Sequence, residues 1–335
     1  MKRIFWIDFG KGLGIFLVVI AHVLANMSNN LVMKSNTAIM TIHSLMYLLF
    51  LIIMPIFFAM SGYLFKVPTT INEYLHLLKK KLIVLGIPYL VFSILLVIFS
   101  EFLKMHIEGV NGILSLSLIP IYPISYLWFL YALFFCFMVV GYLQLIGVNR
   151  FIQYFIYITF TLISIKVPTT NISYYLISNF SWILCFYIGF EVKEKNIKIK
   201  RSVIIASLIL FALSAYLQIN TDKLWFVQGD FFTYSNFGAK ISSIFLLIAL
   251  FTKTNKDNVC VKYFRKYGKI SLIIYLVHVP IISILRKFLV KFDINNPYII
   301  FILLVVLSWY ISIFISMIFN KVKPLDIIFY PKRYF

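Results

Sequence analysis

The side chains best suited to chemistry lie in one apolar stretch near the start of the chain, Ile7 to Asn26. This stretch reads as a membrane-spanning helix, yet it carries Asp8, Lys11 and His22. Residues eleven apart in an α-helix are about 20° out of line, so Lys11 and His22 share one face about 16 Å apart along the axis. Asp8 precedes Lys11 by three residues, close enough to pair with it. Ionisable groups inside a spanning helix are costly, which favours a functional site facing the helix bundle.

His22 is the candidate for proton transfer. A neutral imidazole can accept a proton from a hydroxyl, which is the usual task of a general base. No Ser or Cys nucleophile accompanies His22 in a recognisable motif, and this favours direct attack by a substrate hydroxyl over a covalent enzyme intermediate. A structural alternative stays open, in which Lys11 marks the cytoplasmic end of the helix and His22 hydrogen-bonds to a neighbouring helix.

The composition is that of a polytopic helical membrane protein. Of the 335 residues, 62% are hydrophobic and only 13% are charged, and the mean hydropathy of +0.96 exceeds that of soluble domains. The net charge of +20 comes from short basic segments between apolar runs, which is the pattern of membrane topology rather than of nucleic-acid binding. The three cysteines, Cys136, Cys185 and Cys260, predict neither a disulfide framework nor a metal site.

Ten apolar segments are expected to cross the bilayer as helices. They are residues 12–30, 41–65, 82–103, 126–146, 151–166, 174–191, 202–218, 231–252, 270–290 and 298–319. With the N-terminus in the cytoplasm, 23 of the 31 basic residues fall on the cytoplasmic side. This asymmetry predicts that both termini are cytoplasmic. We expect a single integral-membrane domain over 1–335 with no appended soluble domain.

Several further residues could line a site, and each has an ordinary alternative. The cluster Lys79–Lys81 either marks topology at the cytoplasmic start of the third span or binds a phosphorylated donor. Trp128 is either an interfacial belt residue or a surface on which a sugar ring stacks. Ser61, followed by Gly62, allows close helix approach and could border a cavity. His43 lies near the outer end of the second span, where an interfacial polar role is favoured.

Two more polar residues fall inside later spans. His278 either hydrogen-bonds to a neighbouring helix or belongs to a site. Lys240 lies in the middle of the eighth span, where its ammonium group requires a partner, water or a route to the membrane surface.

Four short motifs together resemble the acyltransferase 3 family of integral membrane acyltransferases. The sequence elements are Asp8-x-x-Lys11-Gly12 followed by His22; Met54-Pro55-x-Phe57-Phe58-x-x-Ser61-Gly62-Tyr63 followed by the lysine cluster and Ile87-Pro88-Tyr89; Leu127-Trp128-Phe129-Leu130; and Ser271-x-x-x-Tyr275-Leu276-x-His278. Their order and spacing span nearly the whole chain. Two positions depart from the family pattern: Ile53 stands where many members have His, and the basic cluster is Lys rather than Arg, which removes bidentate phosphate contacts.

The resemblance implies a membrane O-acetyltransferase, and the strong usage of Ile, Asn and Lys suggests the plasma membrane of a bacterium. The enzyme would move an acyl group, usually acetyl, from cytoplasmic acetyl-CoA to a hydroxyl of an extracytoplasmic glycan such as a capsule or an O-antigen. His22 would be the base, Asp8 and Lys11 would orient the donor side, and Lys79–Lys81 would hold the donor phosphates. Tyr275 and His278 would be cavity residues.

Other functions also fit part of the pattern. A transporter or flippase of a lipid-linked sugar would explain the ten spans, the Pro-containing helices and Lys240, but paired broken-helix repeats are missing from the sequence. A polysaccharide polymerase would be expected to carry a large polar outer loop, whereas the longest here has about twenty residues. A structural scaffold would have no need of Asp8, Lys11 and His22 on one helix.

Overall fold

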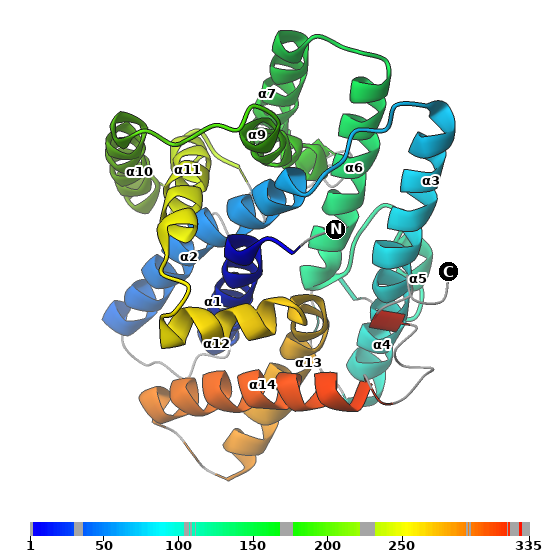
Figure 1. Cartoon of the computed structure of the whole chain (residues 1–335). Helices are drawn as coiled ribbons and strands as arrows, with labels where there is room; N and C mark the ends of the chain where they lie inside the picture. Colours follow the sequence, from blue (N-terminus) through cyan, green and yellow to red (C-terminus); the bar gives the residue numbers. More distant parts are fainter. Residues whose placement is uncertain are drawn as a thin grey trace. The chain divides into compact units, whose positions relative to one another are not determined.

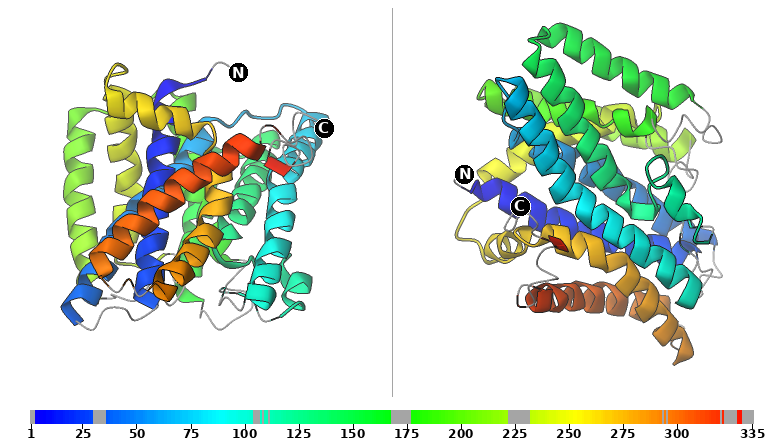
Figure 2. Two further views of the ribbon diagram at one scale, coloured as in Figure 1. Left: turned by 90° about the horizontal axis from the view of Figure 1, so that it is seen from below. Right: turned by 90° about the vertical axis from the view of Figure 1, so that its right-hand side faces the viewer.

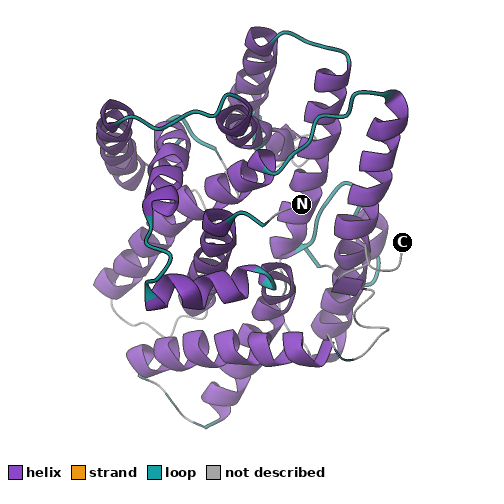
Figure 3. Ribbon diagram, viewed as in Figure 1, coloured by secondary structure: helices purple, strands orange, loops and turns teal. Residues whose placement is uncertain are grey.

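The computed structural model describes residues 3–29, 36–103, 107, 109–110, 112–167, 177–221, 232–292, 294, 296–319, 321 and 328–329. Every regular element in these ranges is helical, which confirms the expected all-α class (Figure 3). In chain order (Figure 1) the helices are α1 (Phe5–Asn29), α2 (Asn36–Tyr63), α3 (Ile71–Lys81), η1 (Leu82–Gly86), α4 (Ile87–Leu103), α5 (Ser115–Leu118), η2 (Ser125–Leu127), α6 (Trp128–Leu145), α7 (Arg150–Lys166), α9 (Ile183–Glu194), α10 (Arg201–Thr221), α11 (Phe237–Lys253), α12 (Val259–Gly268), α13 (Ser271–Lys291) and α14 (Pro297–Phe319).

Seven helical stretches in the described residues are long and apolar enough to cross a membrane. They comprise α1, α2, the continuous run from α3 through α4, η2 with α6, α10, α13 and α14. The chain is therefore a polytopic membrane protein. The other three expected spans overlap α7, α9 and α11, which have 17, 12 and 17 residues. Ten crossings with both termini in the cytoplasm stay a prediction.

The third span begins earlier than the hydropathy pattern predicts. Its helix starts at Ile71, eleven residues before the expected start. Thr70 caps this helix by accepting a hydrogen bond from the Glu73 backbone N–H (3.2 Å). The Glu73 carboxylate in turn accepts from the Thr69 backbone N–H (2.8 Å) and hydroxyl (2.9 Å). The bond to Thr70 satisfies a donor that the first helical turn leaves without a partner, and the bonds from Thr69 fix the chain as it enters the helix.

The cluster Lys79–Lys81 consequently lies inside a helix rather than at the start of one. Its helix, α3, continues through the π-helical turn Leu82–Gly86 directly into α4. The hydropathy pattern does not reveal α3 because one side of this helix is polar and exposed. Its Tyr74 is buried and donates a hydrogen bond to the Met138 carbonyl (3.1 Å). An amphipathic helix is recognised by the periodic spacing of its apolar residues and not by its mean hydropathy.

The helices form two compact units. Unit 1 consists of Met1–Phe57, Ile199–Leu224 and Gly238–Lys323, and unit 2 consists of Phe58–Lys198, Trp225–Phe237 and Pro324–Phe335.

In unit 1, α12 lies across the N-terminal half of α1 at backbone contact distance (Figure 2). A Cβ atom added to Gly12 would lie 1.8 Å from the Phe264 carbonyl oxygen, and one added to Gly268 would lie 1.8 Å from the Asp8 carbonyl oxygen. Each helix thus supplies a glycine to the other at the crossing. Small residues allow this approach, and dispersion contacts between backbones replace the hydrophobic drive that lipid cannot provide.

The other ends of α1 and α13 pack together with α14. Val23 and Met27 of α1 share a buried apolar cluster with Ile282 and Leu289 of α13 and with residues of α14. At the α12 side, Trp309 of α14 donates a hydrogen bond to the Tyr263 hydroxyl (2.8 Å). Because α13 begins three residues after Gly268, α1 and α13 both run away from α12 in the same direction.

Unit 2 contains a second reciprocal glycine crossing, between α2 and α9. A Cβ atom on Gly62 would lie 1.8 Å from the Phe186 carbonyl oxygen, and one on Gly189 would lie 1.9 Å from the Ala59 carbonyl oxygen. Lys193 donates a hydrogen bond to the Phe65 carbonyl (2.8 Å), just beyond the C-terminal end of α2. The predicted close approach at Gly62 is confirmed, and its partner is α9.

We expect Gly12→Ala to destabilise the protein strongly, because its methyl group would overlap the Phe264 carbonyl and force α1 and α12 apart. Overpacking of a rigid contact costs about 1–3 kcal/mol or more. Thermal unfolding in detergent measures the effect. Gly86→Ala is the matched control, since its methyl group would meet only a Leu82 side-chain carbon at 3.4 Å. Equal unfolding midpoints for the two variants would contradict the crossing.

Candidate active site

Six of the residues singled out in the sequence belong to unit 1. They are Asp8, Lys11 and His22 on α1, Lys240 on α11, and Tyr275 and His278 on α13. Ser61, Lys79–Lys81 and Trp128 belong to unit 2. His43 lies in α2, and its side chain is outside the described residues.

The central feature of unit 1 is a pair of histidines. The imidazole rings of His22 and His278 lie 4.8 Å apart between centroids at an interplanar angle of 87°, edge to face. The two side chains come from positions 256 residues apart in the chain. His278 is fully buried, whereas His22 is partly accessible. The first and fourth sequence motifs therefore meet at one place in unit 1.

Both histidines direct the same ring nitrogen into their own helix. His22 Nδ1 is 3.0 Å from the Val18 carbonyl oxygen, and His278 Nδ1 is 2.7 Å from the Tyr275 carbonyl oxygen and 3.1 Å from that of Ile274. A carbonyl oxygen only accepts hydrogen bonds, so each Nδ1 carries the proton. In the neutral imidazole, Nε2 is then the basic atom.

Asp8 and Lys11 do not form the predicted ion pair. Within the described residues no nitrogen–oxygen contact within 4.0 Å joins them, and one Asp8 carboxylate oxygen is buried without a hydrogen bond. Helical spacing brings the two side chains onto adjacent turns but does not bring their charged ends together. The α12 backbone meets Asp8 at its carbonyl oxygen, through Gly268. Lys11 is therefore not neutralised by an ion pair with Asp8.

Tyr275 and Lys240 are both buried in unit 1. The Tyr275 ring lies 6.1 Å from the ring of His278 and is 8% exposed. Lys240 is completely buried in α11, so its ammonium group does not extend to the membrane surface. Burial inside the bundle is the arrangement expected of a functional intramembrane cation.

The three lysines of unit 2 differ in their surroundings. The Lys81 ammonium lies 3.4 Å from the centroid of the Phe137 ring, a cation–π contact that ties α3 to α6. Lys79 is exposed, and Lys80 is partly exposed. Lys79 is thus the member of the cluster best placed to meet a ligand from solution.

Trp128 packs against other aromatic side chains of unit 2. Its ring stacks on Trp182 (5.5 Å between centroids) and on Phe58 (6.4 Å), and both partners are buried. Ser61 precedes the glycine at which α2 crosses α9. These contacts give Trp128 and Ser61 a place in the packing of unit 2, and their contact with a sugar stays a prediction.

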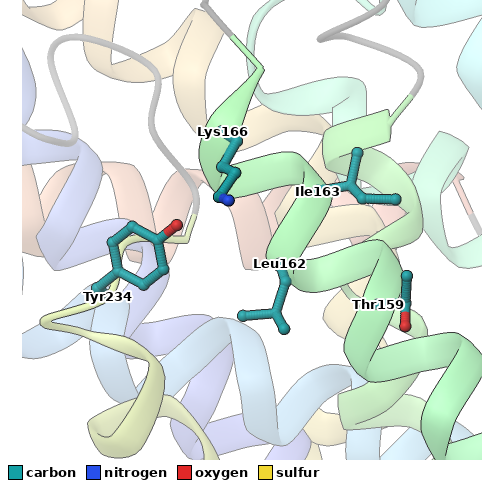
Figure 4. Close-up of a pocket in the computed structure, with 5 residues that line it drawn as sticks. All are labelled: Thr159, Leu162, Ile163, Lys166 and Tyr234. Atoms are coloured by element: carbon teal, nitrogen blue, oxygen red, sulfur yellow. The ribbon is translucent and has the colours of Figure 1, made fainter.

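A surface hollow on unit 2 holds none of these residues. Figure 4 shows its lining, formed by Thr159, Leu162, Ile163 and Lys166 of α7 together with Tyr234. Its walls are mostly apolar, and Leu162 and Ile163 are exposed there. It offers no group of basic or nucleophilic side chains comparable with the histidine pair.

Sequence reasoning assigned the basic segment around α12 to topology alone. Its exposed cations form a surface on unit 1, and Asp257 is the single acidic residue between positions 253 and 269. The cations are Lys253, Lys256, Lys262, Arg265, Lys266 and Lys269. The signal that could have revealed this surface is the amphipathic pattern of α12 itself, with Val261 and Tyr267 buried and the cations exposed.

The fold defines a polytopic membrane protein, and two of its helices bring His22 and His278 into contact. Comparison with protein families matches an acyltransferase domain, that of the acyltransferase 3 family, to residues 4–317. The chain therefore belongs to this family, and it is a membrane acyltransferase. No curated protein and no solved structure matches the chain.

We expect ¹⁵N NMR of histidine-labelled protein in detergent at pH 8 to show His22 and His278 as neutral imidazoles protonated at Nδ1. The reason is that each Nδ1 donates to a backbone carbonyl. The variants His22→Gln and His278→Gln assign the two signals among the five histidines. Signals of the Nε2-protonated form at either position would contradict the arrangement.

Proposed function

We propose that the protein is an O-acyltransferase that moves an acetyl group from cytoplasmic acetyl-CoA to a hydroxyl of an extracytoplasmic polysaccharide. The observation that carries this proposal is the contact between His22 and His278 on two membrane-spanning helices. Membership of the acyltransferase family supports the reaction class. The choice of acetyl group, CoA donor and surface glycan rests on the resemblance of the sequence motifs and on the cationic surfaces.

His22 is the base in this reaction, and His278 acts through it. His22 is partly accessible, whereas its neighbour His278 is completely buried. His22 Nε2 accepts the proton of the sugar hydroxyl as the oxygen attacks the thioester carbonyl carbon. When the carbon–sulfur bond breaks, the same nitrogen returns the proton to the leaving thiolate. General base catalysis of this kind contributes about 10²–10⁴-fold to the rate.

The donor phosphates require cations, and each unit carries a candidate surface for them. Exposed cations surround α12 in unit 1, next to the N-terminal half of α1, which carries Lys11. In unit 2 the cluster Lys79–Lys81 offers Lys79. Ammonium groups pair well with phosphate as point charges. Each of these two surfaces, taken by itself, fits the phosphate groups of acetyl-CoA, which supplies the activated acetyl thioester.

We expect His22→Ala to lose at least about 100-fold in acetyl transfer, because the proton acceptor is removed. Proton NMR of the O-acetyl groups on the host's surface polysaccharide provides the measurement, in a deletion strain complemented at matched membrane levels. His76→Ala is the control, since His76 is exposed on α3. Restoration of acetyl groups by His22→Ala would show that His22 is structural. Loss of the whole polysaccharide in the deletion strain would favour a transporter instead.

Removal of the cations should weaken donor binding and leave the chemical step intact. Two variants test this: the double variant Lys266→Gln/Lys269→Gln and the single variant Lys79→Gln. We expect each to raise the KM for acetyl-CoA several-fold at unchanged kcat, because each removes positive charge proposed to bind the donor phosphates. Acetyl-CoA consumption by the purified protein measures both constants. The control is Lys198→Gln with Lys200→Gln, two exposed lysines between α9 and α10. An unchanged KM in both test variants would rule out these surfaces as the donor site.

A further inference from the structure

Arg286 is a buried cation that the proposed reaction does not use. It lies on α13 and is only 6% exposed. Its Nη1 atom is buried without a hydrogen-bond partner, and no hydrogen bond or ion pair joins the side chain to any residue in the described ranges. A guanidinium keeps its charge under all physiological conditions.

The surroundings of Arg286 are apolar. Its helical neighbours at i−4 and i+3, Ile282 and Leu289, belong to the buried cluster that includes Val23 and Met27 of α1. A charge in such a place is strongly unfavourable unless an opposite charge and hydrogen bonds compensate it. Since none of the described residues supplies such a partner, a bound molecule can supply the compensating anion.

The position of Arg286 relates this anion to the reaction. Arg286 follows His278 by eight residues, about 12 Å along the helix. It lies beyond the histidine pair on the side away from α12, because α1 and α13 both run away from that helix. The cations of α12 and Arg286 thus lie on opposite sides of the histidine pair along unit 1.

We propose that Arg286 binds an oxyanion, a carboxylate or a phosphate, carried by the acceptor substrate. The assignment to the acceptor rests on the proposed function, because that function places the donor phosphates at α12. A guanidinium holds either group through two parallel hydrogen bonds. The acceptor would then be an acidic sugar or a phosphate-bearing glycan, and its anion would fix the distance between the binding point and the hydroxyl at His22.

The test measures ligand-dependent stability of the purified full-length protein in dodecyl maltoside, which contains no phosphate. Thermal unfolding is followed with sodium glucuronate, inorganic phosphate or glucose, with sodium chloride matching the ionic strength. We expect at least one of the two anions to raise the wild-type midpoint, and glucose to leave it unchanged. Arg286→Met should abolish this rise and have a ligand-free midpoint equal to or above that of the wild type, because an uncompensated buried charge is removed.

Two further variants make the outcome decisive. Lys287→Gln, at an exposed neighbouring position, should keep the rise. Arg286→Lys retains the charge but loses the paired contact, so we expect about tenfold weaker anion binding; this variant decides the matter if Arg286→Met does not fold. A rise with glucuronate alone indicates an acidic sugar, and a rise with phosphate alone indicates a phosphorylated acceptor.

The proposal is overturned if neither anion stabilises the wild type beyond sodium chloride, or if Arg286→Met responds as strongly as the wild type. Because this readout requires no turnover, it is independent of the His22→Ala result. Full acetyl transfer by His22→Ala together with Arg286-dependent anion binding would refute the proposed mechanism and leave the anion site standing.

Discussion

The arrangement of unit 1 depends on the backbone contact between α1 and α12. Gly12 and Gly268 each lie where a side chain would overlap a carbonyl group of the other helix. The contact fixes Gly268 against the first turns of α1, and α13 begins only three residues later. In both segments the histidine follows its glycine by ten residues. The glycine crossing therefore determines which residues of α1 and α13 meet further along, and His22 meets His278.

The glycine crossing in unit 2 shows why backbone contacts of this kind suit a membrane protein. Lipid is as apolar as the side chains, so burial of apolar surface gives little drive for helices to associate, and close packing has to provide it. Gly62 and Gly189 bring α2 and α9 together at backbone distance. The Phe65 ring then packs against Phe186 and Phe190. Each glycine crossing thus fixes the position of one helix against the other, and the neighbouring side-chain contacts depend on that alignment.

Most of the helices could be predicted from the sequence because the membrane requires long apolar segments. His22 could be named as a candidate because an ionisable group in such a segment stands out. Its partner His278 could be named but not placed, since 256 residues separate the two and hydropathy carries no information on which helices are neighbours. The start of α3 was missed because its polar face lowers its hydropathy. The Asp8–Lys11 pair was expected from spacing alone, and spacing does not fix where the two charged ends lie.

The hydrogen bond from His22 Nδ1 to Val18 has a consequence for the order of events. With one ring nitrogen held by the helix, the proposed reaction has a single atom, Nε2, at which a proton is gained and lost. The attacking hydroxyl and the departing sulfur must both come within reach of that atom during one encounter. Such a geometry favours a ternary complex in which donor and acceptor are bound together. It disfavours a sequence in which the donor departs before the acceptor arrives.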